Sequence, residues 1–516
     1  MKGESILMTE AAAAGRKPSF TEALVVIVLA GAIISFSILK LGVDAHIPII
    51  FSAIIAAFWA CFMLRYPWKE VEEGMITGIS MALQAIIILG MVGLVIGSWI
   101  LSGVVPTLIY YGLDILSPQF FLLATLFITS IVALATGTSW GTSGTVGIAL
   151  MGIGAGLGIP APITAGIAIS GAYFGDKMSP LSDTTNLAPA VAGTDLFTHI
   201  RAMIWTTGPT YVIVAGIAYY LGNKYAGGTL DAAHIKAIQE LLSAEFTVNY
   251  IGFVPPLIVI GLALLKIPAL PGLFAGILSA CLMALFQGAG PADLIGALHY
   301  GYEPSLAADF AGADGIEAVA QLMQQSNIAG HAPEAIKNAA DMLSELLTRG
   351  GLDSMMWTIS LILCALSFGG ILERCGFLEV LLHTILKGVR SVGGLCASVI
   401  VSCFVCNLFL GDQYLAIVMP GRMFKPAFDE KGLDPRMLSR SLEDSGTLTS
   451  VLIPWNTCGA FQSQVLGVPT LEYLPYAFMN YLNPLVAIII TYLGIGVFWQ
   501  EGKNPKEAAK IGRAHV

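Results

Sequence analysis

The chain has 516 residues, of which 56% are hydrophobic and only 11% are charged, whereas an ordinary soluble domain has roughly 25% charged residues. This composition excludes a protein whose whole surface faces water. The net charge of -9 also argues against a nucleic-acid partner, because no basic stripe is present to neutralise phosphates.

Apolar runs long enough to cross a bilayer, which takes roughly 20 residues each, follow a polar N-terminal segment, residues 1–23. Together with shorter apolar pieces they predict an all-α polytopic membrane protein with about eleven to thirteen transmembrane segments. We expect no cleavable signal, because the first run is itself a spanning candidate. The clearest runs are 24–41, 47–64, 75–101, 120–135, 203–221, 251–265, 273–286, 355–372, 395–410 and 476–498.

Basic and acidic residues are segregated along the chain. Lysine and arginine concentrate before residue 20, in Arg422–Arg440 and in the tail, whereas the region 287–350 is acidic. The positive-inside rule therefore predicts a multi-pass protein of the cytoplasmic membrane with its N-terminus in the cytoplasm.

Short motifs recur at similar distances, which predicts an internal repeat. We expect one repeat at 24–221, an amphipathic linker at 222–249, a second repeat at 250–498 with a polar insertion at about 288–350, and a polar tail at 499–516. Many secondary transporters bind substrate between two such repeats. The paired motifs are Lys40 with Lys266 (offset 226), Gly97–Gly103 with Gly370–Gly376 (273), Gly141–Ser143 with Gly411–Gln413 (270), and Asp183–Thr184 with Asn456–Thr457 (273).

The segment from Gly137 to Gly175 contains eleven glycines, together with Pro160 and Pro162. Such a sequence does not favour a regular spanning helix. Irregular backbone survives at membrane depth only where protein covers it or where it lines a watery cavity. Close helix packing through small residues is the alternative interpretation.

Polar and acidic residues follow this segment and recur in the second copy. A charge inside a membrane is unfavourable by roughly 2.5–3.5 kcal/mol, so it usually marks an ion path. Carboxylate, amide and hydroxyl oxygens suit Na⁺ or H⁺ better than soft metals. A position in a solvated loop is the alternative for each acid. The residues in question are Asp176, Lys177, Asp183, Thr184, Asn186, Asp412, Glu443, Asp444, Asn456 and Thr457.

Two long stretches, GTSWGTSGTVGIALMGIGAGLGIPAP and GDKMSPLSDTTNLAPAVAGTDLFTHIRAM, resemble the signature region of the NhaC family of Na⁺/H⁺ antiporters. GSWILSGVVPTLIYYGL and VLIPWNTCG also resemble that family, and the likeness runs from about Phe20 to Trp499. The resemblance implies exchange of Na⁺ or Li⁺ for H⁺, and includes relatives that exchange malate or lactate. A more distant likeness to the ion-transporter superfamily implies two inverted repeats with broken helices and re-entrant hairpins.

Our own interpretation of the residues is that Asp183 and Asp412 bind Na⁺ and H⁺ in turn. Asp176 is expected either to pair with Lys177 or to act as a third carrier. Neutral oxygens are expected from Thr184, Asn186, Asn456 and Thr457, and from Thr142 and Ser143 of the opposing broken segment.

Two further residues are candidates for pH sensing or gating: Lys177 and His199. For His199 the alternative is a position near the lipid headgroups. We expect no cofactor besides the transported ions. The expected partners are lipid and small inorganic cations, with no nucleic acid, and a homo-oligomer stays open.

Four other functions are alternatives to Na⁺/H⁺ exchange. An exchanger of small organic anions needs a cation for the carboxylate, for which Lys177, Arg374 and Arg440 are candidates. A channel is suggested weakly by Thr145-Val146-Gly147, and an intramembrane aspartyl protease by the pair of Gly-Asp dipeptides at 175–176 and 411–412. An ATP-driven pump is disfavoured, because the chain contains no GxxxxGK[ST] loop. We therefore expect a transporter and not an enzyme.

Overall fold

The computed structural model describes residues 15–226, 232–387, 389 and 391–503. All regular secondary structure in this part of the chain is helical, apart from isolated bridges between Tyr302 and Arg349 and between Leu433 and Trp499. The prediction of an all-α polytopic protein is thus confirmed.

The helices fall into three groups along the chain. The first group is α1 (Phe20–Leu41), α2 (His46–Phe58), α3 (Trp68–Met81), α4 (Leu83–Leu101), α5 (Val104–Ile115), α6 (Pro118–Thr136), α7 (Ser139–Thr142), α8 (Ile148–Gly156), α9 (Ala161–Met178), α10 (Asp183–Ala192) and α11 (Leu196–Ala226). The second group is α12 (Ala232–Glu245), α13 (Val254–Leu264), α14 (Ala269–Phe286), α15 (Pro291–Tyr300), α16 (Ser305–Ala311), α17 (Ile316–Gln325), α18 (Pro333–Leu347) and α19 (Gly351–Ser354). The third group is α20 (Met356–Arg374), α21 (Phe377–Lys387), α22 (Val392–Leu410), α23 (Gln413–Glu430), α24 (Pro435–Ser445), α25 (Thr457–Leu466), α26 (Thr470–Tyr473) and α27 (Phe478–Tyr492).

Six helices of the described residues are long and apolar enough to cross a membrane, or up to eight if each of two bent helix pairs counts as one span. The bent pairs are His234–Glu245 with Tyr250–Leu264, at 91°, and Thr470–Tyr476 with Phe478–Tyr492, at 55°. Shorter apolar helices such as Val104–Ile115 and Leu270–Phe286 explain why a count of apolar runs gives more segments than there are long helices.

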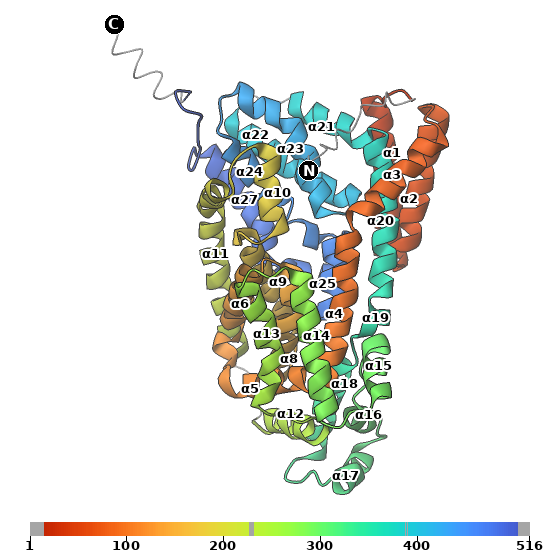
Figure 1. Cartoon of the computed structure of the whole chain (residues 1–516), viewed down its shortest axis with the longest axis vertical. Coiled ribbons are helices and arrows are strands. Elements are labelled where there is room, and N and C mark those ends of the chain that lie inside the picture. The colour runs from red at the N-terminus through yellow and green to blue at the C-terminus, as the bar shows by residue number, and fades with distance from the viewer. Residues whose placement is uncertain (1–14, 227–231, 388, 390, 504–516) are drawn as a thin grey trace, which may run out of the picture.

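Helices α4 and α20 have the same length but run in opposite directions. Helices α4 and α20 are each 19 residues long, at an offset of 273 (356 against 83). They are followed by Gly103 and Gly376, whose φ angles are 75° and 76°. In Figure 1 the next helix, α5, lies near the lower end of the molecule, whereas its counterpart α21 lies near the upper end.

Helices α6 and α22 break in the same way. Each has 19 residues and ends at a glycine in the left-handed region, Gly137 (φ 72°) or Gly411 (φ 69°). The next residue, Thr138 or Asp412, is extended and caps the following helix with its side chain. Glycine is required at the left-handed position because a Cβ disfavours it.

Two short helices correspond as well. Both α10 and α25 have ten residues, begin after an N-cap side chain, Ser182 or Asn456, and end at a left-handed glycine, Gly193 or Gly467. Side-chain oxygens at an N-cap satisfy backbone N–H groups that the helix leaves free. The offset between these helices is 274 (457 against 183).

These conformations correct three of the motif pairings made from sequence. Gly411 matches Gly137 and not Gly141, and Asn456 matches Ser182 and not Asp183. Lys40 lies inside α1, whereas the loop that matches Lys266 (φ 62°) is the one at Arg65 (φ 61°), since each has a proline two residues later. In a glycine-rich chain several alignments of the two halves agree with the sequence equally well. The sign of the φ angle at each glycine shows which glycines correspond.

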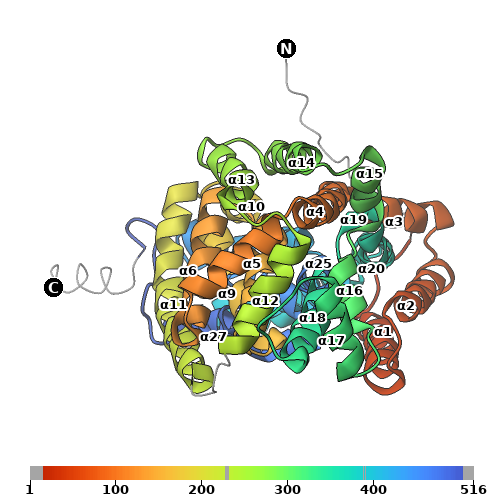
Figure 2. The same cartoon turned by 90° about the horizontal axis from the view of Figure 1, so that it is seen from below.

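The acidic insertion and the basic segment lie at opposite ends of the molecule. Helices α15 to α18 lie at the lower end in Figure 1, and α23 lies at the upper end. Seen from below, α12, α16, α17 and α18 lie across that end of the bundle (Figure 2).

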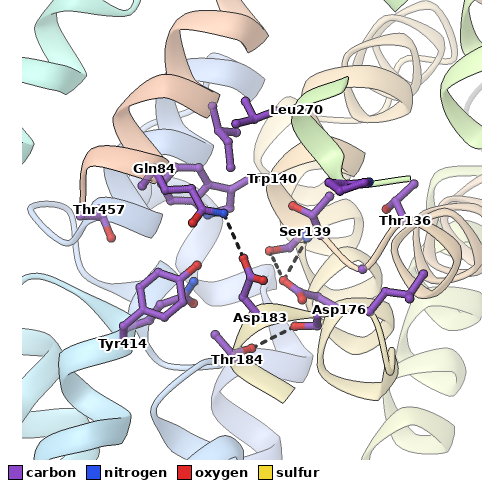
Figure 3. Close-up of a pocket in the computed structure, with 18 of the residues that line it drawn as sticks. Gln84, Thr136, Ser139, Trp140, Asp176, Asp183, Thr184, Leu270, Tyr414 and Thr457 are labelled. Atoms are coloured by element: carbon purple, nitrogen blue, oxygen red, sulfur yellow. Dashed lines mark hydrogen bonds between the residues drawn. The ribbon is translucent and has the colours of Figure 1, made fainter. Parts of the chain in front are cut away.

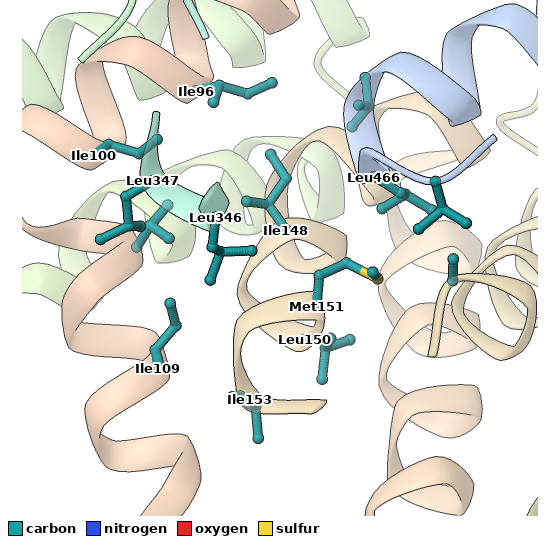
Figure 4. Close-up of a cluster of buried hydrophobic side chains, with 14 of the residues drawn as sticks. Ile96, Ile100, Ile109, Ile148, Leu150, Met151, Ile153, Leu346, Leu347 and Leu466 are labelled. Carbon is teal, nitrogen blue, oxygen red and sulfur yellow. The ribbon is translucent and has the colours of Figure 1, made fainter. Parts of the chain in front are cut away.

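The end of the insertion packs into the core of the bundle. In Figure 4, Leu346 and Leu347 of α18 lie near Ile109 of α5 and Ile148 of α8. Gly152 of α8 leaves the space for this contact, because a Cβ there would lie 2.7 Å from the Leu346 side chain. The lower side of the bundle is therefore tightly filled.

A glycine at the contact between α6 and α9 provides a stability test. Replacing Gly171 by alanine is expected to destabilise the protein by about 1–3 kcal/mol through overpacking, because the new methyl would collide with the Thr129 hydroxyl and the Leu126 carbonyl. Gly216→Ala is the matched control, since nothing lies within 4 Å of the added atom. Thermal denaturation of the detergent-solubilised protein measures both. Equal melting temperatures for the two variants would contradict the packing of α6 on α9.

Candidate functional site

A cavity of about 410 Å³ lies where the helix breaks come together. In Figure 3, Asp176 and Asp183 lie on one side of the cavity, and Tyr414 and Thr457 lie on the other. The cavity is lined by Gln84, Ala85, Ile88, Thr136, Gly137, Thr138, Ser139, Trp140, Asp176, Leu181, Ser182, Asp183, Thr184, Lys266, Ile267, Pro268, Leu270, Pro271, Asp412, Gln413, Tyr414 and Thr457.

The first break holds Asp176. After Gly137 the chain turns, and Thr138 accepts a hydrogen bond from the Gly141 N–H at 3.2 Å. This places both the N–H and the hydroxyl of Ser139 on Asp176 Oδ2, at 3.0 and 2.7 Å. Asp176 itself is in the last turns of α9 and is only 6% exposed.

The second break holds Asp412. Its Oδ1 accepts from the N–H groups of Tyr414 and Leu415, at 2.8 and 3.2 Å, and so caps α23. Its Oδ2 is 3.5 Å from the Thr457 hydroxyl at the start of α25. The Thr457 N–H in turn donates to the Gly411 carbonyl at 2.9 Å, which ties α25 to the break. The helix start stabilises a negative charge on Asp412.

The third carboxylate, Asp183, is the first residue of α10 and is exposed at the cavity. Gln84 of α4 donates to its Oδ2 at 3.4 Å. The next residue, Thr184, is buried and donates from its hydroxyl to Glu443 Oε1 at 3.0 Å. Through Thr184 the cavity wall thus connects to a further buried carboxylate, that of Glu443.

None of Asp176, Asp183 and Asp412 lies within 4.0 Å of a basic group in the described residues. The expected alternative of a pair between Asp176 and Lys177 is wrong, because Lys177 turns away and pairs with Asp444 of α24. A third carrier at Asp176 stays a prediction. The three cavity acids therefore have only neutral donors as partners.

The pair of Lys177 and Asp444 forms a separate buried centre. Both side chains are fully buried, and Asp444 Oδ1 also accepts from Thr206 of α11 at 3.0 Å and from Asn483 of α27 at 2.8 Å. The Arg440 guanidinium lies 4.0 Å from Asp444 Oδ2. A solvated loop position for Asp444, which the sequence left open, is wrong.

Five of the nine predicted ion-binding residues line the cavity, namely Asp176, Asp183, Thr184, Asp412 and Thr457. The other four lie outside its lining. Asn186 is exposed and donates to the carbonyls of Pro180 and Ser182. Asn456 caps α25 and bonds Asn407.

Thr142 and Ser143 lie one turn beyond the first break, where the Thr142 hydroxyl bonds the Thr138 carbonyl at 2.9 Å. The sequence-based pairing of Gly141 with Gly411 therefore points to hydroxyls one turn too far along the chain. Ser139, which follows the break directly, lines the cavity instead.

The two gating candidates also lie outside the cavity lining. His199 is fully buried, with Nδ1 2.9 Å from the Ser439 hydroxyl, and a role in pH sensing stays a prediction. Sequence reasoning missed Gln84, Tyr414 and Lys266. Tyr414 could have been found beside Asp412, but nothing local marks Gln84 or Lys266 as cavity residues.

Comparison with known proteins identifies the family of this chain. The family model described as "Na+/H+ antiporter family" matches residues 171–495, a range that contains Asp176, Asp183 and Asp412. The chain belongs to the Na⁺/H⁺ antiporter family. The resemblance to NhaC proteins is thus confirmed. It is a transmembrane antiporter of this family.

Relatives of this antiporter carry names that state different activities. It is 40% identical to the Na⁺/H⁺ antiporter NhaC of Alkalihalophilus pseudofirmus over 93% of this chain and 96% of that protein. It is 37% identical to the arginine/ornithine antiporter ArcD of Halobacterium salinarum, over 96% of each. It is 36% identical to the malate-2H⁺/Na⁺-lactate antiporter of Bacillus subtilis, over 96% of this chain and 99% of that protein.

Proposed function

We propose that this antiporter exchanges Na⁺, or Li⁺, for H⁺ across the cytoplasmic membrane, and that both ions bind to the same carboxylates. One observation carries the proposal. Asp176, Asp183 and Asp412 line one cavity, and in the described residues no basic side chain forms an ion pair with any of them. Acids without a fixed counter-ion are free to take up a mobile one.

Electrostatics favour the binding of either ion, and a carboxylate must lose its proton before it can ligate Na⁺. Several negative charges in one cavity repel one another, and burial in a membrane protein adds to that repulsion. A proton or a Na⁺ ion relieves it, whereas the empty site keeps the full penalty. If the site changes its access from one side of the membrane to the other only when an ion is bound, each cycle exchanges one ion for the other.

Exchange of a small organic anion is the second candidate, and the presence of Lys266 in the cavity lining favours it. The three cations suggested from sequence do not line the cavity: Lys177 and Arg440 lie beside Asp444, and Arg374 pairs with Glu70 at 2.7 Å. Lys266 is the basic residue that the described lining offers.

The remaining assignments are part of the same proposal. The protein acts as a transporter and not as an enzyme, uses no cofactor besides Na⁺ and H⁺, and has lipid and small inorganic cations as partners. No nucleic acid is involved, and association into a homo-oligomer is compatible with this function. The basic upper end faces the cytoplasm, and by the same rule the N-terminus is cytoplasmic.

Purified protein in liposomes with an internal pH dye tests the proposal. Addition of Na⁺ or Li⁺ is expected to move protons in the opposite direction, with K⁺, malate and lactate inactive. Proton movement driven by malate or lactate, with none driven by Na⁺ alone, would replace the first candidate by the second. A rate that rises linearly with concentration, without saturation, would favour a channel and reject both.

A further inference from the structure

The loop between α13 and α14 brings a positive charge to the acidic cavity. Lys266 lines the cavity together with its neighbours Ile267, Pro268, Leu270 and Pro271. The lysine is exposed, and the ion pairs of the described residues do not include it. All the other charged lining residues are aspartates.

The backbone conformation fixes the position of the Lys266 α-carbon. Its φ angle is 62°, a conformation that is unfavourable for any residue with a Cβ. The turn is held because the Lys266 N–H donates to the Ala263 carbonyl at 2.8 Å and the Ile267 N–H to the Leu262 carbonyl at 3.0 Å. The α-carbon is therefore anchored at the cavity wall, while the four-carbon stem leaves the ammonium free to move.

A second basic residue of the described chain has the same left-handed φ angle but lies away from the cavity. Arg65, between α2 and α3, has a φ angle of 61°, is exposed and precedes a proline by two residues, as Lys266 does. Arg65 does not line the acidic cavity. The φ angle and the formal charge are thus alike at the two positions, whereas only Lys266 lines the cavity with the carboxylates.

A tethered ammonium in a cavity lined by acids must compete with any cation that enters. Like charges in a partly desolvated space repel strongly enough to change a binding constant by about three- to tenfold, even at a separation near a Debye length. The repulsion doubles for a divalent cation, so the factor for Ca²⁺ is the square of that for Na⁺.

We propose that Lys266 determines the cation affinity and selectivity of the antiporter, by competing as a tethered cation for the cavity carboxylates. This inference rests on the proposed function of the same site. Lys266 weakens Na⁺ binding moderately and excludes divalent cations more strongly.

The test uses the purified protein in liposomes with four variants. In Lys266→Gln the KM for Na⁺ is expected to fall about three- to tenfold, and further in Lys266→Glu, with kcat nearly unchanged. Inhibition by Ca²⁺ should strengthen by about the square of that factor. Lys266→Arg keeps the charge and should behave as the wild type does. Arg65→Gln is the matched control, and its KM should also be unchanged.

Three results would overturn the proposal while the wild-type protein still exchanges Na⁺ for H⁺. The first is an unchanged KM for Na⁺ in Lys266→Gln. The second is a fall of the same size in Arg65→Gln, which would indicate a general surface effect. The third is loss of malate- or lactate-driven flux in Lys266→Gln at constant KM for Na⁺, which would assign Lys266 to an organic anion. Absence of Na⁺/H⁺ exchange in the wild type would instead reject the function on which the proposal rests.

Discussion

Asp412→Asn is expected to abolish Na⁺-induced proton movement and leave the fold intact. An amide binds neither a proton nor Na⁺ as a carboxylate does, so the exchange rate should fall to that of empty vesicles. The helix start should survive, because asparagine is as good an N-cap as aspartate and can accept from the Tyr414 and Leu415 N–H groups. Everted vesicles with a pH dye measure the exchange, and fluorescence size-exclusion chromatography measures folding.

Asp434→Asn is the matched control for this variant. Asp434 caps α24 through the Arg436 N–H at 3.0 Å, in the same way as Asp412 caps α23, but it does not line the cavity. Its exchange should be normal. Asp183→Asn should behave as Asp412→Asn does. Wild-type exchange in both cavity variants would remove these residues from the ion site.

Asp444→Asn is expected to cause the largest loss of stability. Without the carboxylate, the buried Lys177 ammonium is left uncompensated, and breaking a buried pair in this way typically destabilises a protein by about 3–5 kcal/mol. The Thr206 and Asn483 donors on α11 and α27 would also lose a charged acceptor. Melting of the detergent-solubilised protein, with expression level as a second readout, measures the effect.

Two further variants show whether the buried pair is the cause. Lys177→Met combined with Asp444→Leu removes both bonded charges and should recover part of the lost stability, since an apolar replacement of a buried pair is often neutral. The nearby Arg440 keeps its bonds to the Gly496 carbonyl and the Thr491 hydroxyl. Glu70→Gln breaks a partly exposed pair with Arg374 and should change stability by only about 0–1 kcal/mol. A double variant no more stable than Asp444→Asn would contradict the account of this centre.

Five of the predicted site residues could be found from sequence because acids and hydroxyls beside glycine-rich breaks are unusual in a membrane segment. Asp176 and Asp412, each preceded by glycine at the end of an apolar run, are the clearest cases. The partner of Lys177 could not be predicted. Asp444 is 267 residues away, and its surroundings come from four helices that only the packed structure brings together.

Motif spacing predicts a duplication, but it does not give the alignment of the helix breaks. The amino-acid sequence aligns Gly411 with Gly141 as well as with Gly137. The alignment with Gly141 indicates Thr142 and Ser143 as the hydroxyls of the site, whereas the alignment with Gly137 indicates Ser139. The left-handed φ angles at Gly137 and Gly411 decide between them. Gln84 and Lys266 were missed because each lies in a sequence without other polar residues that could mark a site.

The pH dependence of the KM for Na⁺ in proteoliposomes tests the central claim, that Na⁺ and H⁺ compete for the same unpaired acids. If they do, each unit of acidification at pH values where the acids are protonated should raise the KM by about tenfold for each competing proton, as for any ion whose ligands must be deprotonated, and the maximal rate at saturating Na⁺ should stay constant. A KM that does not change with pH, accompanied by a falling maximal rate, would contradict competition at one site.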